Sequence, residues 1–134
     1  PKHVVTEFTK ALFKKQLLNW NSHILILGAT FKENCPDLRN SKVLDIFNEL
    51  KEFGVNVSIF DPVANSRELN QIYGESNVLN SLDNTNGFQG VILAVAHDDF
   101  KKIGFQSIQE MTIEGGIIYD LKCLFEKSEN TLRL

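Results

Sequence analysis

The chain has 134 residues, which suits one domain, and 43% of them are hydrophobic, which is enough for a packed core and too many for a disordered tail. Its net charge of −3 gives no reason to expect nucleic acid or an anionic membrane surface as a partner. No apolar run approaches the roughly 20 residues that span a bilayer. An anionic ligand would therefore need local basic residues to hold it against the overall negative charge.

The two cysteines, Cys35 and Cys123, lie far apart and form neither a CxxC motif nor a Cys/His spacing typical of zinc. We interpret them as free thiols in a reducing compartment and expect a cytoplasmic protein without a metal site. No signal peptide is recognisable. Because the sequence begins at Pro1 without a methionine, we expect it to be a fragment of a longer protein.

The predicted elements alternate between helix and strand along the chain. Apolar residues at helical spacing predict an opening helix over residues 3–19. The unalternating apolar run at 23–28 predicts a strand buried on both faces, as in a parallel sheet. Further strands are expected at 55–60, 77–79, 90–95 and 115–119, helices at about 41–53, 64–73 and 97–111, a helical turn at 81–86, and a polar, partly ordered tail at 125–134.

This alternation predicts an α/β fold, namely a three-layer Rossmann-like parallel sheet with helices on both faces, preceded by an N-terminal helix. Right-handed crossovers place the first strand beside the one at 90–95, with the two halves of the chain winding outward from this pair. The ligand crevice should then open above the carboxyl ends of these two strands.

Three loops leave the carboxyl ends of strands and should share one edge of the sheet: residues 29–40, 96–99 and 120–123. Together they carry four potential cations, which are Lys32, Arg39, His97 and Lys122. Such a group in an acidic domain indicates a site for a phosphate-bearing ligand. The alternative is that the lysines belong to an ordinary solvated surface.

The loop after the first strand lacks the GxGxxG fingerprint of dinucleotide-binding folds. Only Gly28 is present, and the residues that follow are Ala29-Thr30-Phe31-Lys32. Asp61 stands where an acid would bind a ribose, but without the glycines we interpret it as a turn residue. The pattern therefore indicates a Rossmann-type sheet that does not bind a dinucleotide in the usual way.

A nucleophilic site is a weaker hypothesis. Cys35 precedes Pro36 in the long loop, and His97 could face it across the crevice as a base. Nothing in the sequence indicates that the thiol is activated. His97 is open to two further interpretations, as a general base or as a strand-end histidine that hydrogen-bonds to the backbone, and the second is favoured.

Four segments carry a resemblance to a known family: GATFKENCPDLRNSKVLDIFNEL, VSIFDPVAN, GVILAVAHDDF and IIYDLK. They resemble the C-terminal, UDP-sugar-binding domain of the UDP-glucose/GDP-mannose dehydrogenase family, and the resemblance covers nearly the whole chain. TFKxxxxDxR is its most specific part. The sequence is most similar in character to the bacterial branch that acts on UDP-N-acetylhexosamines for capsular or surface polysaccharide.

The resemblance implies an oxidoreductase that oxidises the C6 alcohol of a UDP-sugar to a uronic acid in two NAD-dependent steps. It also implies that residues 1–20 are the end of an inter-domain helix and that 21–134 form the UDP-sugar-binding domain. NAD would be bound mainly by an N-terminal domain outside this sequence, and a central helix would form a homodimer. The family's catalytic cysteine lies in a glycine-rich motif that neither cysteine here matches, so the chain alone should be inert.

The same resemblance implies roles for particular residues. Phe31 and Lys32 should contact the UDP-sugar, Lys32 through its charge and Phe31 mainly through its backbone. Arg39 should reach the NAD of the other domain, and Asp37 should orient the loop or pair with Arg39. Lys122 stands where some members have an arginine that touches substrate, although lysine cannot make a bidentate contact.

Two other classes of function remain open from the sequence. One is a stand-alone Rossmann-type binding or regulatory module that senses a nucleotide or an acyl-CoA. The other is a structural oligomerisation domain driven by the opening helix.

Overall fold

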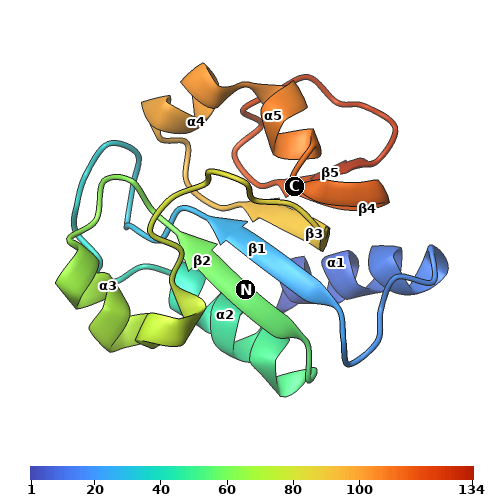
Figure 1. Cartoon of the computed structure of the whole chain (residues 1–134), viewed down its shortest axis with the longest axis horizontal. Coiled ribbons are helices and arrows are strands. Elements are labelled where there is room, and N and C mark those ends of the chain that lie inside the picture. The colour runs from blue at the N-terminus through green and yellow to red at the C-terminus, as the bar shows by residue number, and fades with distance from the viewer.

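The computed structural model describes residues 1–134 and shows a five-stranded, wholly parallel sheet between layers of helices (Figure 1). The strands are β1 (His23–Leu27), β2 (Asn56–Phe60), β3 (Phe88–Leu93), β4 (Thr112–Asp120) and β5 (Thr131–Arg133). The helices are α1 (Lys2–Lys14), α2 (Val43–Glu52), α3 (Ser66–Tyr73), α4 (Asp98–Ile103) and α5 (Phe105–Gln109), with a 3-10 helix η1 (Glu75–Asn77). The sheet order is β2-β1-β3-β4-β5, which confirms the α/β class and the pairing of the first strand with the one expected at 90–95.

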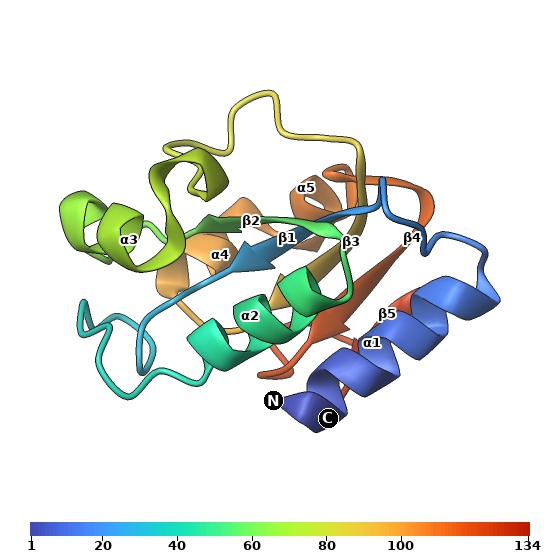
Figure 2. The same ribbon diagram turned by 90° about the horizontal axis from the view of Figure 1, so that it is seen from below.

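The sheet separates two apolar cores because successive side chains of a strand point to opposite faces. In β1, Ile24 and Ile26 join the core under α1 and α2, whereas Leu25 and Leu27 join the core under α4 and α5. Figure 2 shows these helix pairs on opposite faces of the sheet. All four β1 side chains are fully buried, which confirms that the unalternating apolar run marks a central parallel strand.

Helix α1 belongs to the first of these cores. Its buried face includes Val5, Phe8 and Leu12, and the Phe8 ring lies so close to Gly90 of β3 that a methyl group there would overlap it. Glycine at this position therefore lets the helix approach the sheet. The expected role of residues 1–20 as the end of an inter-domain helix stays a prediction.

Helix α1 ends at Lys14, earlier than the predicted residue 19. Gln16 adopts a left-handed conformation, with φ 61°, and its amide donates to the Phe13 carbonyl at 2.9 Å. The Leu17 amide donates to the Leu12 carbonyl at 2.8 Å, which completes a Schellman motif. The prediction overran because this stop uses glutamine where a glycine usually signals the end.

The second half of the chain differs from prediction in four places. In the segment expected as a third strand, Val78 makes one isolated parallel bridge to Ile59. Residues 81–86 contain turns and no helix. The helix expected at 97–111 is divided at Gly104, whose φ is +86°. The tail supplies β5, whose Thr131 pairs with Ile118 of β4.

None of the helices combines the length and apolar character that a membrane crossing needs.

Phe8→Ala should destabilise the protein by about 3–5 kcal/mol, because it removes a fully buried ring between α1 and the sheet. The matched control is Phe13→Ala on the same helix, where the ring is 71% exposed and the expected change is within about 0.5 kcal/mol. Urea unfolding followed by circular dichroism measures both. Equal, small losses for the two variants would show that α1 is not part of the folded core.

Candidate functional site

The candidate site lies at the carboxyl edge of the sheet, between β1 and β3. From this pair, β2 lies on one side of the sheet and β4 and β5 lie on the other. Ligands of open α/β sheets bind at this switch point. Gly28 ends β1 with φ +100°, and a Cβ there would lie 2.7 Å from the Cβ of Val95. The lack of a side chain at Gly28 thus lets the segments that follow β1 and β3 approach each other closely. The loop 29–42 then crosses the edge of the sheet to α2.

A cavity of about 190 Å³ opens at this switch point, and we name it the basic cleft. Lys32 of the first loop, Lys42 before α2 and Lys122 after β4 line it, together with Phe31 and the acidic Glu33. Two positive charges of the loop 29–42 and one from the segment after β4 meet beside the N-terminus of α2, which also favours anions. The cleft can therefore hold a phosphate group by charge and hydrogen bonding.

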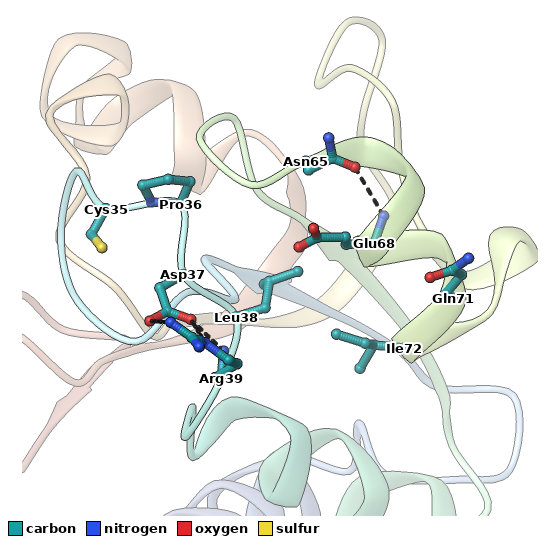
Figure 3. Close-up of a pocket in the computed structure, with 9 residues that line it drawn as sticks. All are labelled: Cys35, Pro36, Asp37, Leu38, Arg39, Asn65, Glu68, Gln71 and Ile72. Atoms are coloured by element: carbon teal, nitrogen blue, oxygen red, sulfur yellow. Dashed lines mark hydrogen bonds and ion pairs between the residues drawn. The ribbon is translucent and has the colours of Figure 1, made fainter.

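A second cavity, of about 720 Å³, lies between residues 35–39 and α3 (Figure 3). Arg39 lines it and forms a two-bond ion pair with Asp37, with Nε to Oδ1 at 3.0 Å and Nη2 to Oδ2 at 3.2 Å. This hydrogen-bonded pairing lowers the pKa of Asp37 and raises the pKa of Arg39. The expected Asp37–Arg39 pair is confirmed, and the Arg39 side chain is 87% exposed.

Beneath the two cavities lies a buried polar network centred on Asp61 and His97. The two oxygens of Asp61 accept hydrogen bonds from the amides of Ala29 at 2.6 Å, Val63 at 2.8 Å and Ala64 at 2.9 Å. His97 Nε2 lies 2.9 Å from Asp61 Oδ2, and both side chains are fully buried. Asp61 is thus the turn residue that its sequence context indicated, and it also joins the ends of three strands.

The hydrogen bonds to Asp61 keep its carboxylate charged inside the protein. Burial raises the pKa of Asp61, but the hydrogen bond from His97 and those from three backbone amides outweigh it and hold the pKa below its ordinary value. With its oxygens occupied in this way, the carboxylate has a structural role and does not face a ligand.

A second buried carboxylate, Asp120, fixes the loop that carries Lys122. Its two oxygens accept hydrogen bonds from the amides of Leu124 and Phe125, each at 2.9 Å. Asp120 ends β4, so the carboxylate holds residues 121–125 against the sheet edge. The position of Lys122 at the cleft therefore depends on a residue that does not itself line the cavity.

The structure separates the four cations that were expected at one site. Lys32 and Lys122 line the basic cleft together, whereas Arg39 lines the second cavity. His97 lies fully buried and lines neither cavity, so its expected place beside the lysines at the ligand site was wrong. Its ring contacts the backbone amide of Asn34, as the favoured interpretation of a strand-end histidine predicted.

The hypothesis of a Cys35–His97 nucleophilic pair is not supported. No hydrogen bond joins the two side chains, and both ring nitrogens of His97 have other partners. No three His, Cys, Asp or Glu side chains come together as metal ligands do. What the arrangement offers is anion binding at the basic cleft.

Sequence reasoning missed three residues of this region. Lys42 was overlooked although it lies in the first turn of the helix predicted at about 41–53, and in the structure it directly precedes α2. Thr30 and Asn34, which contact His97, carry no such signal, because their partners are distant in sequence.

Strand order 2-1-3-4-5 with a basic cleft at the switch point defines a Rossmann-like domain of the kind that binds nucleotides at this edge. Residues 25–127 match the sequence profile of the UDP-glucose/GDP-mannose dehydrogenase family, UDP binding domain. The chain therefore belongs to this family, and the fold and family inferred from sequence motifs are confirmed.

Individual relatives agree with this assignment. The chain is 39% identical over 132 residues to a UDP-N-acetyl-D-glucosamine 6-dehydrogenase of Pseudomonas aeruginosa, covering 98% of this chain and 31% of the relative. It is 34% identical to protein CapL of Staphylococcus aureus, covering 96% of this chain and 30% of the relative. The chain thus spans about a third of the length of the curated relatives it matches.

Solved structures share the fold. A UDP-D-ManNAc dehydrogenase from Pyrococcus horikoshii superposes with a TM-score of 0.78 at 20% identity, covering 98% of this chain and 30% of that chain. At this level of identity the likeness supports the architecture alone.

Asp61→Asn should destabilise the chain at pH 7 by about 1–3 kcal/mol, because it removes a charged acceptor from buried donors. Since the folded pKa is lowered, this stabilisation is present above the unfolded value of about 4 and is lost as pH falls through the folded pKa. Urea unfolding at pH 7 and pH 3 should show the difference between wild type and variant shrinking in acid.

The control for this series is Asp83→Asn, at an exposed loop carboxylate for which no hydrogen bond is found. Its stability should follow wild type at both pH values. A constant deficit of Asp61→Asn from pH 7 to pH 3 would contradict the assigned role of the charge.

Proposed function

We propose that the chain is the UDP-sugar-binding domain of an NAD-dependent nucleotide-sugar 6-dehydrogenase, which oxidises the C6 alcohol of a UDP-sugar to a uronic acid for capsular or surface polysaccharide. The observation that carries the proposal is that the family's UDP binding domain matches residues 25–127, a range that includes the three lysines of the basic cleft. The name of the Pseudomonas aeruginosa relative favours a UDP-N-acetylhexosamine as the sugar nucleotide.

In this proposal the basic cleft receives the sugar nucleotide. Lys32 and Lys122 supply positive charge to its diphosphate, and Phe31, whose ring is 57% exposed, lies beside them. Lys42 adds a third charge at the start of α2. The diphosphate would occupy the switch point of the sheet, where strand ends and a helix N-terminus favour an anion.

Arg39 has a different proposed partner, the NAD held mainly by an N-terminal domain of the parent enzyme. Its position supports this role, because it lines the second cavity and its guanidinium is exposed away from the three lysines. The parent enzyme is proposed to act in the cytoplasm as a homodimer. In that enzyme residues 1–20 end an inter-domain helix, 21–134 form the UDP-sugar domain, and the catalytic cysteine lies in neither part.

Lys32→Ala and Lys122→Ala should each weaken UDP binding to the chain about tenfold, because each removes one charge from the diphosphate site. Isothermal titration calorimetry at low and moderate salt measures the affinity, which should fall as salt rises. Lys51→Ala, at the other end of α2, and Arg39→Ala, at the second cavity, are the controls and should bind like wild type. Equal losses in all four variants would indicate a non-specific charge effect, and no binding by wild type would refute the proposal.

The chain alone should not reduce NAD in the presence of UDP-N-acetylglucosamine or UDP-glucose, because the proposed nucleophile and NAD-binding domain are not among its residues. NADH absorbance over several hours provides the measurement, with a full-length relative as positive control. Turnover that scales with the concentration of the pure chain would show that it contains a complete active site.

A further inference from the structure

The imidazole of His97 links three segments at the carboxyl edge, although it lines neither cavity. It lies between β3 and α4, is fully buried, and contacts the loop after β1 through Asn34 and the residue after β2 through Asp61. Asn34 in turn accepts a hydrogen bond from the amide of Asp98, at the start of α4, at 3.0 Å.

These contacts demand a ring that accepts at one nitrogen and donates at the other. The Asn34 amide donates to Nδ1 at 2.9 Å, so Nδ1 carries no proton. Nε2 must then carry the proton that faces Asp61 Oδ2 at 2.9 Å. A neutral imidazole meets both demands at once, whereas an apolar residue of similar size would leave a buried carboxylate oxygen and a backbone amide without these partners.

Phe31 and Lys32 lie between two fixed points of the loop backbone. Before them, the hydroxyl of Thr30 lies 3.3 Å from His97 Nε2 and donates to the carbonyl of Lys32 at 3.0 Å. After them, the Asn34 amide is held by Nδ1. The exposed side chains of Phe31 and Lys32 thus project into the basic cleft from a backbone that the Thr30 hydroxyl closes on one side and His97 Nδ1 holds on the other.

We propose that His97 is a positioning residue for the ligand of the basic cleft, with separate roles for its two nitrogens. The Nδ1 contact with Asn34 holds the 30–34 segment so that Lys32 meets the phosphate. The Nε2 contact with Asp61 serves mainly the stability of the fold. The identity of the ligand as UDP rests on the proposed function, whereas the fixing of the loop does not.

Two substitutions divide these roles. In His97→Asn, the side-chain oxygen takes the place of Nδ1 and can still accept from the Asn34 amide, but the contact with Asp61 is lost. In His97→Gln, the amide reaches the place of Nε2 and can still donate to Asp61, but the acceptor for Asn34 is lost. Hydrogen exchange of the Asn34 and Ala29 amides, measured by NMR, reports which contact survives in each variant.

We expect His97→Gln to unfold at a urea concentration closer to wild type, to lose protection of the Asn34 amide, and to bind UDP about tenfold more weakly. His97→Asn should be less stable, keep the Asn34 amide protected, and bind UDP within about threefold of wild type. Affinity would then follow the loop contact and not the stability. A purely structural histidine would lose affinity in the order of lost stability, and that result would overturn the proposal.

Thr30→Val is the further test if either histidine variant fails to fold, because it removes the hydroxyl link to Lys32 and leaves the contacts of His97 with Asn34 and Asp61 in place. It should weaken UDP binding several-fold while Ala29 stays protected, and unchanged binding would overturn the proposal. If wild type does not bind UDP, the proposed function fails. Loss of Asn34 protection in His97→Gln would then still support the loop claim, and retained protection would refute it.

Discussion

The carboxyl edge of this domain depends on the buried carboxylate of Asp61. Its oxygens accept from one amide just after β1, from two amides of its own turn, and from His97 in the connection between β3 and α4. A single anion therefore sets the relative positions of three strand ends. Buried charge is costly, and the hydrogen bonds that surround Asp61 are what make it tolerable here. The loop 29–42 is built on this anchor, and both cavities are built on the loop.

The loop 29–42 replaces the glycine-rich turn of dinucleotide-binding folds with a longer segment that presents side chains on two sides. Phe31 and Lys32 face the basic cleft, whereas Arg39 faces the second cavity. The amide of Phe31 donates to the carbonyl of Asp37 at 2.8 Å, so the two halves of the loop are joined to each other. This backbone bond fixes the segment that carries Lys32 relative to the segment that carries Arg39.

Much of the fold and of the candidate site could be predicted from the sequence wherever the residues that carry the signal are neighbours in the chain. The apolar run of β1 and the strand-end positions of Lys32 and Lys122 were sufficient to place a basic site at the correct edge. The Schellman stop at Gln16 was missed because its residue type is not diagnostic, and β5 was missed because three residues gain their partner only from β4. His97 was wrongly expected beside the lysines at the ligand site. Its hydrogen-bond partners are 36 and 63 positions away, so no neighbouring residue in the sequence indicates them.

The distribution of charge limits what the basic cleft can recognise. Lys32, Lys42 and Lys122 converge from different segments on a chain of net charge −3, so the positive potential is local to the cavity. Lysine acts as a compact point charge, and it cannot make the planar contact with two parallel hydrogen bonds that arginine makes with a phosphate. Under the proposed function, the lysines would attract the diphosphate of any nucleotide sugar and discriminate little between bases. Selection between bases would then depend on neutral groups of the cleft, and the exposed Phe31 on the anchored loop is one candidate.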